Sequence, residues 1–134
     1  VSIPVIGNGD VTTLSDAKTL LEQSGADGVM IGRGSYGRPW FLGQVIHYLK
    51  TGEELPDPAL NEQLSILLEH YTGILSHYGV YAGIRIARKH IGWYSKGLPG
   101  AAEFRAKVMI GTEENQVIDM IRQFYLPLIE LKAA

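Results

Sequence analysis

The stretch Val29 to Trp40, VMIGRGSYGRPW in one-letter code, decides the fold of this chain. The apolar run Gly28 to Ile31 predicts a buried strand, and Pro39 suits the first turn of a following helix. Such a strand–glycine–helix junction is a good arrangement for holding a phosphate, because glycines let backbone N–H groups approach the anion. Arg33 adds a planar set of donors. The same residues also fit a tight turn with a solvated arginine, so both interpretations stay open at this point.

A second glycine-rich loop precedes this stretch. Residues Ile3 to Ile6 predict a short buried strand that ends at the loop Gly7 to Asp10. Residues Asp16 to Gln23 predict a helix capped by Asp10 or Ser15. Short apolar strands that alternate with helices are typical of a parallel sheet. Because both glycine loops leave the carboxyl ends of their strands, they meet at the edge where parallel α/β folds bind ligands, which favours the phosphate site.

The start of the chain predicts a longer parent protein. The sequence has 134 residues and begins with Val1 rather than with methionine. Two strands can neither make a stable sheet nor close a barrel, so we expect the missing strands to lie N-terminal to Val1. A helix from Pro39 to Leu49 is expected to end the α/β part. Residues 51–58, with three acidic residues and two prolines, are predicted to be a linker.

Composition limits the function classes. The chain is 46% hydrophobic and 19% charged, as expected of a globular protein. It lacks cysteine, which excludes disulfides, thiolate metal sites and a cysteine nucleophile within these residues. No apolar run approaches the roughly 18 residues of a transmembrane helix. We therefore expect no membrane span. Because the four histidines share no ligand motif, we expect no metal site either.

The part after the linker is predicted to be helical throughout. Asp57 and Pro58 are expected to cap and begin its first helix. An apolar stripe at helical spacing predicts a buried face, and Gly79 ends the helix. The stripe consists of Leu60, Leu64, Leu67, Leu68, Tyr71, Leu75 and Tyr78.

The next predicted helix, Tyr81 to Lys96, carries an unusually cationic face. At about 100° per residue, its basic residues and Gly92 fall within a third of the circumference. Opposite them lies an apolar face from Ile84 to Tyr94. A basic row with Trp93 beside it and a glycine that allows close approach suits a nucleic-acid backbone. A solvated basic face is the alternative. The row consists of Arg85, Arg88, Lys89 and Lys96.

Two further helices complete the prediction. The first runs from Ala101 to Met109, and Gly111 breaks it. Thr112 is expected to cap the second, and Pro127 to end or kink it. Four such helices would make a small bundle. The expected apolar stripe of the last helix is Val117, Ile118, Ile121, Phe124 and Tyr125.

Five motifs together resemble the C-terminal part of bacterial tRNA-dihydrouridine synthases, most closely the B-type enzymes. They are IPVIGNGD at residues 3–10, GADGVMIGRG at 25–34, GRPW at 37–40, RKHIGWY at 88–94 and GLPG at 97–100. The resemblance covers essentially the whole chain. The first two motifs occur in other flavin-dependent barrels as well, whereas the fourth is more particular to this family.

The resemblance implies an α/β plus all-α fold. Residues 1–50 would be the last two βα units of an FMN-binding TIM barrel, and residues 51–58 a linker. Residues 59–134 would be a helical, four-helix bundle-like tRNA-binding domain. The implied FMN contacts are Asn8, Gly9 and Asp10 after the seventh strand, and Gly32 and Arg33 after the eighth. The implied tRNA contacts are Arg85, Arg88, Lys89 and Lys96.

The family reaction, as implied, is reduction of the C5–C6 double bond of a uridine in tRNA. NADPH reduces the FMN, and a cysteine outside this chain acts as general acid. We therefore expect no catalytic residue here, no turnover by the 134-residue chain alone, and a cytoplasmic location. Two rival interpretations remain: a flavin barrel oxidoreductase acting on a small molecule, and a non-catalytic RNA-binding module.

Overall fold

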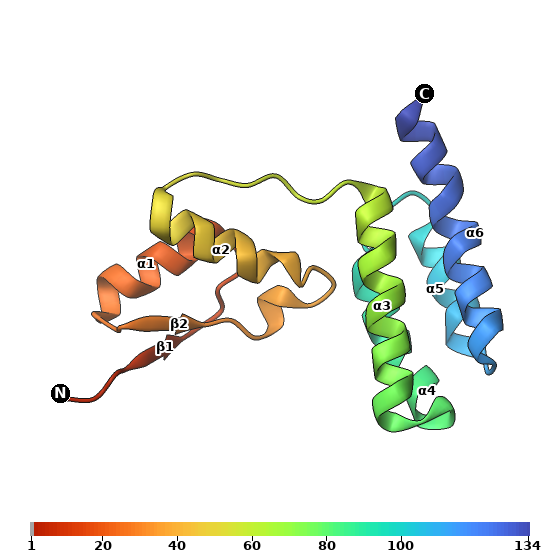
Figure 1. Cartoon of the computed structure of the whole chain (residues 1–134), viewed down its shortest axis with the longest axis horizontal. Coiled ribbons are helices and arrows are strands. Elements are labelled where there is room, and N and C mark those ends of the chain that lie inside the picture. Colours follow the sequence, from red (N-terminus) through yellow and green to blue (C-terminus); the bar gives the residue numbers. More distant parts are fainter. Residues whose placement is uncertain (1) are drawn as a thin grey trace. The chain divides into compact units, whose positions relative to one another are not determined.

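The computed structural model describes residues 2–134, which divide into two compact units between Asp57 and Pro58. Figure 1 shows the elements along the chain. Each unit is described by itself below. The first unit contains β1 (Ile6–Asn8), α1 (Leu14–Ser24), β2 (Gly28–Met30), the short 3₁₀ turn η1 (Arg33–Ser35) and α2 (Trp40–Thr51).

The first unit is a β–α–β crossover followed by a helix. Strands β1 and β2 pair in parallel, with Gly7 opposite Val29. Helix α1 connects them and packs on both, and α2 packs on α1, so both helices lie on one side of the strands (Figure 1). A small core between the helices and the sheet contains Val11, Ala17, Phe41 and Val45.

The two faces of this sheet differ in burial. Gly7 lies against Leu20 of α1, and Val29 packs on the core. On the opposite face, Ile6 and Met30 are 59% and 51% exposed. The prediction of fully buried strands was therefore wrong for this chain, because nothing among the described residues covers the second face.

The first strand also begins later than predicted. Ile3 to Val5 lie outside β1, which starts at Ile6. The N–H of Val5 donates to the Asp27 carboxylate over 2.8 Å, and the Val5 carbonyl accepts from the N–H groups of Asp27 and Gly28. These bonds to the turn before β2 replace a regular strand ladder at that point.

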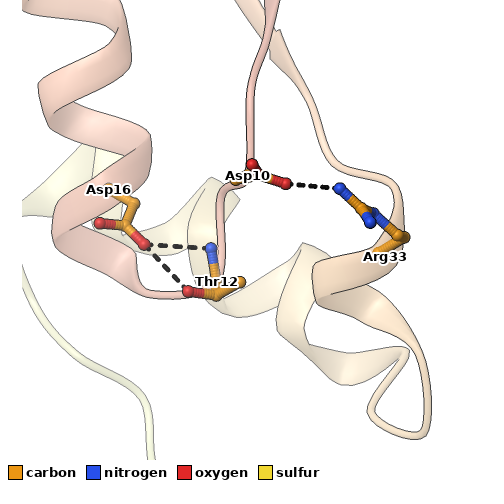
Figure 2. Close-up of polar contacts among 4 residues, drawn as sticks. All are labelled: Asp10, Thr12, Asp16 and Arg33. Carbon is orange, nitrogen blue, oxygen red and sulfur yellow. Dashed lines mark hydrogen bonds and ion pairs between the residues drawn. The ribbon is translucent and has the colours of Figure 1, made fainter.

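Helix α1 is capped by Thr13, so the predictions of Asp10 and Ser15 were wrong. The Thr13 hydroxyl accepts from the Asp16 N–H over 3.1 Å, and the Asp16 carboxylate accepts from the Thr13 N–H over 3.0 Å, which completes a capping box. The same carboxylate accepts from the N–H and hydroxyl of Thr12 (Figure 2). These hydrogen bonds, that of the Thr12 N–H first, lower the pKa of Asp16.

The second unit consists of four helices: α3 (Leu60–Tyr78), α4 (Val80–Ser95), α5 (Ala101–Ile110) and α6 (Glu114–Ala133). Helix α3 packs against α4 and α6, and α5 packs against α4 and α6. The best-buried hydrophobic side chains of this unit are Leu67, Tyr71, Ile84, Ala87, Ile91, Val108, Val117, Ile121 and Tyr125. No helix within residues 2–134 has the length and apolarity needed to span a lipid bilayer.

Three helix boundaries of this unit differ from prediction. Asp57 does not cap α3, because its carboxylate accepts from Nε2 of Gln44 over 2.9 Å and the N-cap is Ala59. Thr112 does not cap α6, whose N-cap is Glu113. Of the two effects predicted for Pro127, an end or a kink, the end is wrong, because α6 continues to Ala133. Pro127 lies on the exposed side of the helix, where water can satisfy the carbonyl that lacks a partner.

The apolar stripe of α3 ends one turn earlier than predicted. Leu60, Leu64, Leu67, Tyr71 and Leu75 are buried, whereas Tyr78 is exposed and Ile74 takes part in the core in its place. Gly79 follows directly with φ of 83°, so the chain leaves α3 at Tyr78 and turns into α4.

Replacing Gly83 with alanine is expected to destabilise the helical unit by about 1–3 kcal/mol, since the added carbon overpacks a tight helix contact. An ideal Cβ at Gly83 would lie 2.8 Å from Cα of Leu75. Gly73→Ala is the matched control, because nothing lies within 4 Å of its Cβ position, and it should stabilise α3 by up to about 1 kcal/mol. Urea unfolding followed by circular dichroism measures both; equal effects would contradict this packing.

Candidate functional site

The two glycine loops of the first unit line one open cavity of about 420 Å³. It lies at the carboxyl ends of β1 and β2, the edge that the sequence predicts. The residues that line it are Asn8, Gly9, Asp10, Val11, Thr12, Gly32, Arg33, Gly34 and Tyr36. The structure thus brings the five predicted residues of these loops together around a single cavity, which we call the rim cavity.

The backbones of the two loops approach each other closely at Gly34. An ideal Cβ at Gly34 would lie 2.0 Å from the carbonyl oxygen of Val11. Only glycine fits at this position, because any side chain would displace the backbone of the other loop. Gly34 therefore sets the distance between the loop after β1 and the loop after β2.

Arg38 fastens the same two loops, and sequence reasoning did not assign it a role. Its Nε donates to the Gly34 carbonyl over 2.8 Å, and its Nη2 donates to the Thr12 carbonyl. The guanidinium carbon lies 4.0 Å from the centroid of the Phe41 ring. A half-buried cation thus binds carbonyls from both loops. The only feature of the sequence that indicates this role is the position of Arg38, four residues after Gly34 and directly before Pro39.

Arg33 and Asp10, which both line the rim cavity, point toward each other (Figure 2). Nη2 of Arg33 lies 2.8 Å from Oδ1 of Asp10, and the side chains are 80% and 83% exposed. Asp10 adopts a positive φ of 42°, which aspartate tolerates better than most residues. An ion pair this exposed is weak, so an anion of higher charge can compete for the guanidinium.

Gly9 and Gly32 leave open space at the rim. Nothing lies within 4 Å of an ideal Cβ at either residue, so their lack of a side chain is not explained by contacts among the described residues. A ligand can therefore approach the backbone closely at both points. Together with the exposed Arg33, this arrangement suits the terminal phosphate of a nucleotide.

In the helical unit, the predicted core face of α4 is confirmed: Ile84, Ala87, Ile91 and Tyr94 are buried. Arg85 and Lys89 are exposed on the opposite side. Arg88 differs from them, because it is half-buried and its Nη2 donates to the Gly111 carbonyl over 2.9 Å. The structure therefore assigns Arg88 a role in holding the α5–α6 turn against α4.

Two other predicted features of this face are placed differently. Lys96 is exposed but lies after α4, whose last residue is Ser95, in the turn that follows the helix. The space over Gly92 is filled from within the protein, since an ideal Cβ there would lie 3.2 Å from Cδ of Arg105 on α5. Gly92 thus makes room for Arg105 rather than for an approaching backbone.

A cluster of rings joins α3 to α4. Nδ1 of His70 lies 2.9 Å from the Tyr94 hydroxyl, and the His70 and His90 ring centroids are 5.0 Å apart. The edge of the cluster is formed by Trp93, at 5.1 Å from His90. Burial lowers the pKa of both histidines, and His70 and Lys89 lower that of His90 further. Among residues 2–134 no group of three or more potential metal ligands is present.

These lowered pKa values predict that the helical unit loses stability below neutral pH. The unfolded chain takes up protons near the ordinary histidine pKa of 6.5, whereas folded His70 and His90 resist protonation until lower pH. The contribution of the two neutral histidines to the free energy of unfolding is therefore fully present above pH 6.5, and it falls as the pH drops below 6.5. The melting temperature should be lower at pH 5 than at pH 7.5. His90→Gln should reduce this difference, and His77→Gln, an exposed control, should leave it unchanged.

The fold and these two sites define a class: an α/β unit whose two glycine loops meet at a rim cavity, followed by a unit of four helices. A family model described as dihydrouridine synthase matches residues 1–128. The chain belongs to this family.

Proteins with similar sequences carry descriptions that match this family. The chain is 56% identical over 129 residues to a probable tRNA-dihydrouridine synthase of Rickettsia bellii, covering 96% of this chain and 40% of that protein. It is 54% identical to the protein of the same description from Rickettsia conorii, covering 97% and 39%. A tRNA-dihydrouridine synthase B of Pseudomonas aeruginosa is 47% identical, covering 93% and 38%. The chain therefore spans about two fifths of the length of these relatives.

Proposed function

We propose that this chain is the C-terminal part of an FMN-dependent tRNA-dihydrouridine synthase, which we call the parent protein. The observation that carries the proposal is the rim cavity, where the two loops meet with an exposed arginine and two open glycines. Membership of the family supports the reaction, reduction of a tRNA uridine to 5,6-dihydrouridine, and we propose NADPH as the source of electrons.

The rim cavity fits the phosphate end of FMN. Gly9 and Gly32 leave their backbone open to a close anion, and Arg33 has the charge and the donors to pair with it. Asp10 is itself an anion, so it would contact FMN through its N–H or through the hydroxyls of the flavin chain, and Asn8 would add a polar contact. When bound, FMN supplies the hydride. The residues of this chain bind and position it.

The uneven burial of the sheet supports a barrel assignment. Ile6 and Met30 lie exposed on the face opposite α1, which is the face that closed barrels fill with side chains. We therefore assign residues 1–50 to the last two βα units of a TIM barrel and residues 51–58 to the linker. The helices of residues 59–134 form the tRNA-binding domain, with a bundle-like arrangement.

The exposed cations of α4 support tRNA as the partner. Arg85 and Lys89 lie on one face, Lys96 follows at its end, and α4 contains no acidic residue. Phosphate contacts from such residues position an RNA without reading its sequence. The target uridine must leave its stack to reach the flavin. The family resemblance implies a cysteine as the general acid, and the chain contains none, so we assign the general acid to another part of the parent protein.

The test is formation of dihydrouridine in an unmodified tRNA transcript. The parent protein with FMN and NADPH should convert uridine, as measured by mass spectrometry of the digested tRNA. The 134-residue chain alone should not. The parent protein could instead bind FMN, transfer electrons from NADPH to a small molecule and have no measurable affinity for tRNA. That result would favour the interpretation as a small-molecule oxidoreductase.

A further inference from the structure

Four residues of α4 form a strip in which two aromatic side chains flank two cations. Tyr81, Arg85, Lys89 and Trp93 follow one another at intervals of four residues. Each interval rotates by about 40° around the helix and rises about 6 Å, so the strip is one continuous band roughly 18 Å long. The band lies opposite the buried face that contains Ile84.

The N-terminal end of the strip is an exposed ring covered on one face by a cation. The guanidinium carbon of Arg85 lies 3.6 Å from the Tyr81 ring centroid, and Nη1 donates to the Tyr81 carbonyl over 2.9 Å. Tyr81 is 74% exposed. The hydrogen bond holds the guanidinium plane over the Tyr81 ring. A nucleotide base can stack on this pair as a third plane.

The C-terminal end repeats the pairing more loosely. Nζ of Lys89 lies 5.9 Å from the Trp93 ring, and the His90 ring meets that indole edge to face at 5.1 Å and 88°. Trp93 is half-buried and therefore less mobile than a surface side chain. Within residues 2–134 neither Arg85 nor Lys89 forms an ion pair with a carboxylate.

We propose that this strip binds unpaired RNA nucleotides, with bases stacked at Tyr81–Arg85 and at Trp93 and with phosphates at Arg85 and Lys89. The inference deepens the proposed function, on which it rests. Single-stranded RNA is bound by aromatic and guanidinium planes combined with positive charge, whereas a duplex keeps its bases stacked inside. A strip that served only duplex phosphates would need cations but no exposed ring.

The charge of the strip favours RNA over a protein occupant. No acidic residue of α4 neutralises Arg85 and Lys89, so the occupant of this surface has to supply negative charge, which an RNA backbone carries at every phosphate. Val80 and Tyr81 are the exposed large hydrophobic residues at the start of α4, so the upstream part of the parent protein is the competing occupant. The experiment distinguishes the two.

The test compares two probes on the 134-residue chain: a 5′-fluorescein single-stranded RNA of about 12 nucleotides and a duplex of the same length, titrated by anisotropy at several salt concentrations. Tyr81→Ala should weaken single-strand binding about tenfold, with an unchanged salt slope and an unchanged duplex affinity, because only stacking is lost. Tyr81→Phe should bind as the wild type does. Arg85→Ala should weaken binding and lower the salt slope by about 0.7, and Arg122→Ala, an exposed arginine of α6, should do neither.

Three results would contradict the binding of unpaired RNA nucleotides by the strip. Single-strand affinity of Tyr81→Ala within twofold of wild type is the first, and an equal loss for the duplex is the second. The third is a lowered melting temperature of Tyr81→Ala in the parent protein with RNA affinity retained, which would identify the strip as an internal contact. The proposed function fails separately, when neither this chain nor the parent protein binds tRNA at all.

Discussion

Replacing Gly34 with alanine should abolish FMN binding by the parent protein and destabilise the α/β unit by about 3 kcal/mol. The added Cβ would lie 2.0 Å from the Val11 carbonyl oxygen, a distance that no side chain can adopt. One loop must therefore move, and the hydrogen bond from Nε of Arg38 to the Gly34 carbonyl is strained with it. Flavin fluorescence in the purified protein and thermal unfolding measure the two effects.

Gly32→Ala separates binding from folding at the same rim. Its Cβ would meet no protein atom within 4 Å, so the variant should fold normally and lose FMN affinity only because the added methyl group meets the ligand. Gly43→Ala, on α2 and equally open, should leave the FMN affinity unchanged. A Gly34→Ala protein that keeps its FMN would show that the spacing of the loops is unimportant for the cofactor.

Replacing Arg85 and Lys89 together with alanine should cause the largest loss of tRNA affinity available on the helical unit. Each exposed cation that contacts a phosphate displaces counterions, so the double variant should lower the salt slope of tRNA binding by between 1 and 2 units. At low salt this corresponds to a loss of at least tenfold. Filter binding of an unmodified tRNA transcript between 50 and about 200 mM salt measures both quantities.

Two controls sharpen this result. Arg122 and Lys132 are exposed on α6, and their double replacement with alanine should leave the slope unchanged. Arg88→Ala should act differently again, since it removes the hydrogen bond to the Gly111 carbonyl and should lower thermal stability with little change in slope. Equal slopes for the Arg85/Lys89 and Arg122/Lys132 variants would remove α4 from the RNA interface.

Periodicity carried most of the fold prediction. The buried face of α4 and most of that of α3 follow from apolar residues at helical spacing, because burial of one stripe is what stabilises such helices. Helix ends were predicted less well. Several side chains near α1 can act as its cap, and only the reciprocal bonds between Thr13 and Asp16 select Thr13.

The candidate sites were predictable to different degrees. Glycine loops at the carboxyl ends of parallel strands must share an edge, so the rim cavity follows from topology. The roles of Arg38 and Arg88 do not. Each binds a backbone carbonyl more than 20 residues away, at Thr12 and at Gly111. A helical projection places Arg88 with Arg85 and Lys89, but it contains no neighbouring helices and cannot distinguish a half-buried cation from a solvated one.

The most direct test of the account is the FMN dissociation constant of the parent protein with Arg33 replaced by alanine, measured by flavin fluorescence. We expect binding at least about tenfold weaker than wild type, because a charged donor to the phosphate is lost. Lys18→Ala, a surface cation of α1 paired with Glu22, should bind FMN as the wild type does. An unchanged dissociation constant for Arg33→Ala would contradict the assignment of the rim cavity to the FMN phosphate.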